Sequence, residues 1–166
     1  LAAGALPVTI EGDHSINIPC IRAFEGQGDM HVLQIDALLE FVDERHGVRH
    51  GHGNPMRRAA EQDFVTGLTQ VGIRNVSSTA REGYEDARAM DAFCPSIAPG
   101  TGTPSHGGFL YYDVLEMLQE VARRHEIVGI DLVEVAPEYD PTGSTASLSA
   151  QVLMNLLGFI FHARGM

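Results

Sequence analysis

Two short stretches of the sequence carry the side chains that metal-dependent hydrolysis requires. The first is Gly12-Asp13-His14-Ser15, which follows an apolar run and offers an imidazole and a carboxylate. The second runs from Asp36 to Glu40. The side chains of these two acids project to one side if the segment is extended. Two divalent ions held by such groups lower the pKa of a shared water and supply a nucleophile near neutral pH. Carboxylates with one or two imidazoles suit manganese better than zinc.

Each of these side chains also has a structural interpretation. His14 alone could be a buried histidine with satisfied hydrogen bonds, and Asp36 could cap a loop or a helix. Glu40 could be a solvated acid. A local cluster of histidines in the loop at 42–53 could be an ordinary exposed polar segment, and it comprises His46, His50 and His52.

Strands and helices are expected to alternate along the chain. Short apolar runs predict strands at 7–10, 31–36, 71–76 and 127–135. Helical patterns predict helices at 16–24 with Ser15 as the cap, and at 55–68, 111–125 and 144–162. The Gly- and Pro-rich stretch 95–108 is read as a loop.

This alternation is typical of an α/β fold with a parallel sheet. Ligands of such sheets bind beyond the carboxyl ends of the strands. His14, Asp36 and Glu134 all fall at such ends in the predicted arrangement.

Composition narrows the class of protein. The 166 residues are enough for one domain with a real core, and 44% of them are hydrophobic. A net charge of -11 argues against nucleic acid or an anionic membrane as a partner. Two cysteines, Cys20 and Cys94, form no disulfide framework, so a cytoplasmic setting is expected. No signal peptide is expected at 1–8, and the apolar stretch 152–161 is interrupted by Asn155 and Gly158.

Longer motifs occur in a fixed order along the chain. They are the Gly12 to Ser15 signature and the segments 34–59, 93–109 and 131–137. Together they resemble the ureohydrolase (arginase/agmatinase) superfamily, and within it the agmatinase-like guanidino hydrolases. The resemblance implies a three-layer α/β/α fold with a mainly parallel central sheet, incomplete here. Residues 1–166 would form a single domain that lacks the family's N-terminal part and an internal segment near 79–90.

The resemblance also implies an activity and the residues that carry it. Family members use two manganese ions to hydrolyse a linear guanidino compound, such as agmatine or guanidinobutyrate, and release urea. They form trimers or hexamers, so a homo-oligomer is expected. By position, the metal ligands would be His14, Asp36, Glu40 and Asp91. His52 would move protons, and Glu134 would receive the guanidinium group.

Several positions depart from the family pattern, among them Glu40, which replaces an aspartate, and Glu11, which replaces a glycine. Leu38 stands where a histidine ligand belongs, Ala89 replaces a carboxylate ligand, and Cys94 replaces an aspartate. A site with one ion, or with none, is therefore expected in place of two. Two hypotheses follow: a guanidino hydrolase with impaired activity, or a degenerate, non-catalytic member that serves as a structural or oligomer-forming protein.

Overall fold

The computed structural model describes residues 4–75, 90–91 and 97–165. The chain divides into two compact units, one formed by Leu1–Gly12 with Phe93–Met166 and the other by Asp13–Ala92. Each unit has its own set of parallel strands. The organisation of residues 1–166 as a single domain stays a prediction.

The first unit contains a parallel pair of short strands, β1 (Val8–Ile10) and β5 (Ile130–Leu132). Val8 is paired with Ile130, and the pairing continues beyond the strands because the Glu11 amide donates to the Leu132 carbonyl at 3.1 Å. The strands were predicted over longer stretches, and the one expected at 127–135 forms only its central part. Parallel pairing between such distant segments requires crossover connections, as in an α/β fold.

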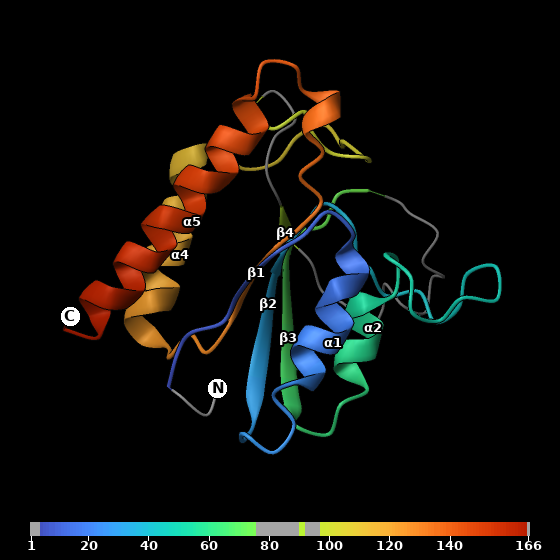
Figure 1. The fold of residues 1–166 in the computed structure, drawn as a ribbon, viewed down its shortest axis with the longest axis vertical. Coiled ribbons are helices and arrows are strands. Elements are labelled where there is room, and N and C mark those ends of the chain that lie inside the picture. The colour runs from blue at the N-terminus through green and yellow to red at the C-terminus, as the bar shows by residue number, and fades with distance from the viewer. Residues whose placement is uncertain (1–3, 76–89, 92–96, 166) are drawn as a thin grey trace. The chain divides into compact units, whose positions relative to one another are not determined.

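Two helices of the first unit, α4 (Tyr111–Arg124) and α5 (Ser144–Ala163), lie side by side (Figure 1). Val114 and Leu118 of α4 are buried, as are Leu156 and Ile160 of α5. Their spacing of four residues places each pair on one face of its helix. Both helices agree with the sequence prediction to within one residue at their ends.

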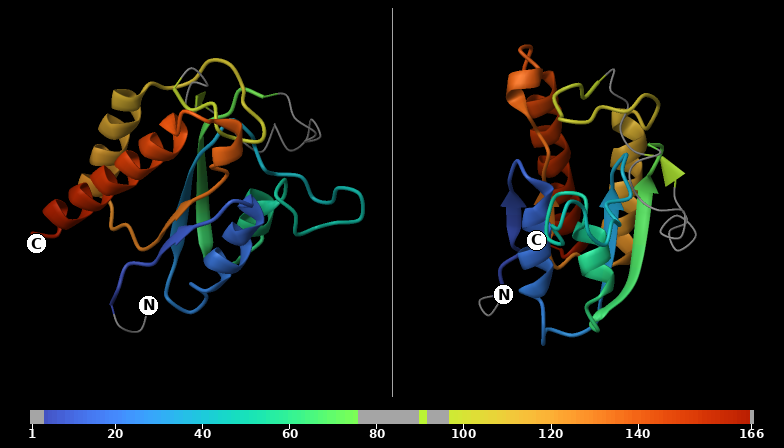
Figure 2. Two further views of the ribbon diagram at one scale, coloured as in Figure 1. Left: turned by 45° about the horizontal axis from the view of Figure 1, so that its top comes forward. Right: turned by 90° about the vertical axis from the view of Figure 1, so that its right-hand side faces the viewer.

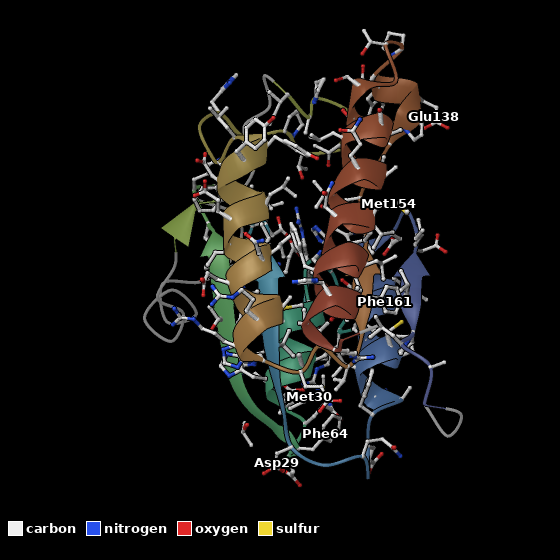
Figure 3. The ribbon with its side chains drawn as sticks, turned by 90° about the vertical axis from the view of Figure 1, so that its left-hand side faces the viewer. Asp29, Met30, Phe64, Glu138, Met154 and Phe161 are labelled. Atoms are coloured by element: carbon white, nitrogen blue, oxygen red, sulfur yellow. The ribbon has the colours of Figure 1, made fainter. Side chains whose placement is uncertain are left out.

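The α5 helix is also long and apolar. Its most apolar 18-residue window has a mean hydropathy of 1.4 and is 11% buried, so by length and composition it would qualify as a membrane-crossing helix. A single helix of this kind is weak evidence for a membrane span, because the core helix of a soluble protein and a signal sequence meet the same criterion. Met154 and Phe161 extend from this helix in Figure 3, and both are exposed. The expected absence of a membrane partner stays a prediction.

The second unit is a parallel sheet with the strand order β2-β3-β4, formed by β2 (Met30–Ile35), β3 (Val65–Gly72) and β4 (Met90–Asp91). Figure 2 shows the long β3 beside β2. Before β2, the chain forms a short 3-10 helix, η1 (His14–Ile16), which is followed by α1 (Asn17–Arg22). The α1 helix packs against α2 (Pro55–Ala60), which also contacts β3.

The helix predicted at 55–68 is wrong in its second half. The helix ends at Ala60, and β3 begins at Val65. Val65, Thr66 and Thr69 are β-branched and favour a strand. Gly67 has a structural reason in this strand, because a Cβ at this position would collide with the ring of His31 on β2. The strand expected at 71–76 therefore starts earlier and ends at Gly72.

The predicted cap of the first helical segment is also wrong. Ser15 lies inside η1, and the residue before this short helix is Asp13. The Asp13 Oδ1 accepts a hydrogen bond from the Ser15 backbone amide at 2.8 Å. An aspartate carboxylate is a stronger acceptor for such an amide than a serine hydroxyl, so the cap moves two positions toward the N-terminus.

A buried carboxylate fixes the start of α5 in the first unit. Asp140 Oδ2 accepts hydrogen bonds from the Thr145 amide at 2.7 Å and from the Thr145 hydroxyl at 2.8 Å. The same hydroxyl accepts from the Gly100 amide at 2.8 Å. A Cβ at Gly100 would lie 2.9 Å from both Asp140 Cβ and Thr145 Oγ1, so this close approach requires glycine. The contact ties the loop that contains Gly100 to the helix start. After β5, the chain reaches this helix through η2 (Pro137–Tyr139).

These contacts predict a dependence of stability on pH. Hydrogen bonds from the Thr142 hydroxyl and from Thr145 lower the pKa of Asp140 from 3.8 to about 2. Because the folded-state pKa is depressed, the stabilisation is present above pH 3.8 and is lost as the pH falls toward 2. Thermal unfolding between pH 6 and pH 2 should show a steeper fall in Tm for the parent chain than for Asp140→Asn. Asp29→Asn, an exposed control, should follow the parent; equal slopes for all three would contradict this assignment.

Candidate metal centre

His14 opens the short helix η1 and presents a buried ring nitrogen. The residue is 4% exposed, and its Nδ1 lies 3.6 Å from Asp36 Oδ2. This nitrogen makes no hydrogen bond within the part of the chain that the structure describes. A buried polar atom without a partner carries a free-energy cost, and a bound metal ion would remove it. The interpretation of His14 as a histidine with satisfied hydrogen bonds is therefore wrong for its Nδ1.

Asp36 follows β2 directly and is held in one orientation. Its amide donates to the Val71 carbonyl at 2.9 Å, which continues the ladder between β2 and β3. Oδ1 accepts from the Leu38 amide at 2.9 Å, and Oδ2 accepts from Gln34 Nε2 at 2.8 Å. The structural interpretation of Asp36 as a loop cap is thus correct as far as Oδ1 is concerned. It does not exclude metal binding, because each carboxylate oxygen has a second lone pair.

Two glutamines on neighbouring strands support Asp36 through hydrogen bonds. Gln34 and Gln70 face each other across β2 and β3, and both are buried. Gln70 Nε2 donates to Gln34 Oε1 and to the Leu39 carbonyl. Gln34 Nε2 also donates to the Leu38 carbonyl at 3.3 Å. The amide pair therefore fixes both the carboxylate and the turn that follows it, as groups around metal ligands commonly do.

Leu38 contributes only its backbone to this arrangement. Its amide and carbonyl serve Asp36 and Gln34, and its hydrocarbon side chain offers no donor atom. The carboxylate of Asp36 and the imidazole of His14 are donor types that bind divalent metal ions.

Glu40 is buried, with 6% exposure, so its interpretation as a solvated acid is wrong. Its backbone has φ 50°, in the left-handed region, and the segment from Asp36 to Glu40 is not an extended strand. The condition for these two acids to project to one side, an extended segment, is therefore not met. The Glu40 carbonyl instead accepts from the Met56 amide at 3.0 Å and fixes the start of α2.

The loop residue His52 lies close enough to Asp13 to affect its ionisation. Hydrogen bonds from Ser15 are the main cause of the lowered pKa of Asp13, and the charges of His52 and His14 add to it. Of the predicted site residues in the second unit, the structure thus places His14 and Asp36 next to each other.

Two further predicted residues, Asp91 and Glu134, are described within their own units. Asp91 belongs to β4 and pairs with Gly72 of β3. Glu134 belongs to the first unit, where its backbone has φ 62° and its amide donates to the Gly12 carbonyl at 3.1 Å. Ala89 and Cys94 lie outside the described residues.

Sequence reasoning missed four buried polar side chains. Gln34 and Gln70 support Asp36, whereas Asn54 and Arg58 bond to the loop that contains His52. A signal for two of them was present. Gln34 and Gln70 interrupt otherwise apolar strands, and a polar side chain in a buried strand must find hydrogen-bond partners. Asn54 and Arg58 had no such signal, because polar residues near a helix start are ordinary.

Comparison with known proteins identifies a family. A family model described as "Arginase family" matches residues 1–89 and 86–158. Guanidinobutyrase from Pseudomonas aeruginosa is 30% identical over 196 residues, covering 95% of this chain and 61% of that protein. Mitochondrial agmatinase from Gallus gallus is 31% identical, with 95% of this chain and 57% of that protein covered. The chain thus spans about three fifths of the length of these relatives.

Solved structures support the predicted fold class. Proclavaminate amidino hydrolase from Streptomyces clavuligerus matches with a TM-score of 0.82 and 28% identity. The match covers 94% of this chain and 64% of that one. The expectation of an incomplete α/β/α fold of the ureohydrolase type is confirmed by this likeness.

Proposed function

The chain belongs to the arginase family, and we propose that it acts as a metal-dependent hydrolase on a small linear guanidino compound and releases urea. Both relatives described above carry names of guanidino-compound hydrolases. The single observation that supports the proposal most strongly is the buried His14 Nδ1, 3.6 Å from an oriented Asp36 carboxylate.

His14 and Asp36 would hold the ion, with Glu40 and Asp91 as further ligands by resemblance. When bound, manganese activates water as a nucleophile near neutral pH. Gln34 keeps the Asp36 carboxylate from rotating, because its amide occupies one side of Oδ2. Preorganised ligands of this kind avoid a reorganisation cost during the reaction.

His52 would supply the proton that the leaving amine requires. Water adds to the guanidinium carbon, the bond from that carbon to the substituted nitrogen breaks, and the proton goes to this nitrogen. An imidazole is suited to the step because its ordinary pKa is near neutral. Glu134 would receive the positive charge of the guanidinium group, in the role that the resemblance gives it.

The residue at Leu38 favours a second candidate function. In this case the chain would be a family member that keeps the fold but does not catalyse the reaction. The residue offers no donor where the family has an imidazole. In that case the chain would serve as a structural or oligomer-forming protein, and a homo-oligomer is expected under either candidate.

The proposal is tested by urea release from a panel of linear guanidino compounds, including agmatine and 4-guanidinobutyrate, after manganese loading. We expect slow urea release that a chelator abolishes. His52→Gln should lower kcat by roughly 10²–10⁴-fold, the usual contribution of a positioned proton donor. His125→Gln, which changes the residue after α4 in the first unit, is the matched control. Absence of urea release from every compound would favour the second candidate.

A further inference from the structure

Arg58 is a buried cation that the proposed function does not use. It lies on α2, and its side chain is 2% exposed. A charged group in such a position loses most of its hydration and requires strong partners. Its partners therefore indicate what the residue holds in place.

The guanidinium group joins α2 to the loop at 41–53. Arg58 donates to Asp43 Oδ1 at 2.6 Å and to Glu61 Oε1 at 2.7 Å. A third bond goes to the Arg49 carbonyl at 3.4 Å. Glu61 follows α2 directly. Asp43 and Arg49 lie on the two arms of the loop, and a backbone bridge between Arg45 and Val48 joins these arms. One side chain thus fixes both arms.

Asn54 closes the same loop at its base. Its Nδ2 donates to the Val42 carbonyl at 2.6 Å, and its Oδ1 accepts from the Gly51 amide at 2.9 Å. The Val42 amide donates to the Gly53 carbonyl at 3.1 Å. The backbone is therefore held immediately before and immediately after His52, although the His52 side chain itself is exposed.

We propose that Arg58 is a positioning residue that fixes the loop at 41–53 and thereby the place of the His52 imidazole. The inference rests on the proposed function for the role of His52, but the anchoring of the loop does not depend on it. Arg58 contacts neither substrate nor metal in this account; it acts through Asp43 and the Arg49 carbonyl.

The geometry requires arginine. A planar guanidinium presents donors in several fixed directions, so it reaches two carboxylates and a carbonyl together. A lysine ammonium is a compact charge on a flexible stem and would satisfy only part of this set. Arg58→Lys should therefore keep the fold while loosening the loop.

The first test is amide hydrogen exchange of the full chain. In Arg58→Met, exchange in the loop at 41–53 should become roughly 10–100-fold faster, as expected for loss of hydrogen bonds to charged groups. Exchange in β2 and β3 should remain as in the parent. Arg58→Lys should fall between the two. Arg124→Met is the matched control, because Arg124 is an exposed arginine that pairs with Glu120 on α4.

Two outcomes of this test would overturn the anchoring. One is unchanged exchange in the loop of a folded Arg58→Met or Arg58→Lys chain. The other is faster exchange throughout β2 and β3 in both variants, because Arg58 would then support the whole unit and not the loop.

The second test asks whether the anchored loop matters for His52. In the parent, the His52 ring should give one sharp NMR signal, which is assigned by its loss in His52→Gln. In Arg58→Lys, this signal should broaden or split. During urea release, Arg58→Lys should lower kcat with KM changed by less than about twofold, the pattern of a group that acts in the chemical step. An unchanged signal would overturn the positioning of His52. If the parent releases no urea, the proposed function fails, while the exchange and NMR results still decide the inference about Arg58.

Discussion

Asp36→Asn should lower the affinity of the chain for manganese by more than about 100-fold, because loss of a ligand exceeds the effect of removing a supporting group. The asparagine oxygen can still accept from the Leu38 amide, as Asp36 Oδ1 does at 2.9 Å. The new NH₂ group, however, would face Gln34 Nε2, which donates to Asp36 Oδ2. Two donors then oppose each other, and the negative charge that attracts a divalent cation is gone.

The affinity is measured by titration with Mn²⁺, following the free ion by electron paramagnetic resonance. Asp29→Asn is the control, because it removes one exposed carboxylate from the same unit and leaves the net charge equal to that of Asp36→Asn. Equal affinities for the parent and Asp36→Asn would contradict the assignment of Asp36 as a ligand. A Tm close to that of the parent is needed to show that the loss is local.

Restoring both altered ligand positions should produce the largest gain. The double variant Leu38→His with Ala89→Asp is expected to bind a second manganese ion and to release urea at least tenfold faster than the parent. The structure supports the first substitution, because the Leu38 backbone is already bonded to Asp36 Oδ1 and an imidazole would begin beside that carboxylate. The second substitution follows from the resemblance.

A matched control separates this gain from a general effect of added histidine. Leu110→His with Ala89→Asp introduces the same side chains but places the imidazole at an exposed leucine before α4. It should not bind a second manganese ion, because it restores only one of the two ligand positions. Equal gains in both double variants, or no gain at Leu38→His with Ala89→Asp, would count against the alignment of Leu38 with the missing ligand.

The sequence predicts the elements whose pattern is long and regular. The helices α4 and α5 follow from apolar side chains at helical spacing, such as Val114 and Leu118. The strand that ends at Asp36 follows from its apolar run. The segment 61–72 could not be assigned correctly from periodicity alone, because Phe64 and Leu68 fit a helix as well as a strand, and β-branched side chains decided the outcome.

The candidate ligands were found from motif and chemistry, whereas their support was not. His14 and Asp36 belong to recognisable signatures, but no rule of spacing connects Gln70 with Gln34 or Arg58 with Asp43. These pairs depend on strand register and on the path of the loop at 41–53. The conformation at Glu40 is a similar case, because a left-handed backbone at glutamate is not indicated by residue type.

Bound manganese per chain tests the central claim most directly. The chain is reconstituted with manganese, desalted, and subjected to elemental analysis, with Asp36→Asn treated in parallel. We expect close to one ion per parent chain and close to none for the variant. A parent chain that retains no manganese would contradict the claim that His14 and Asp36 form a metal site.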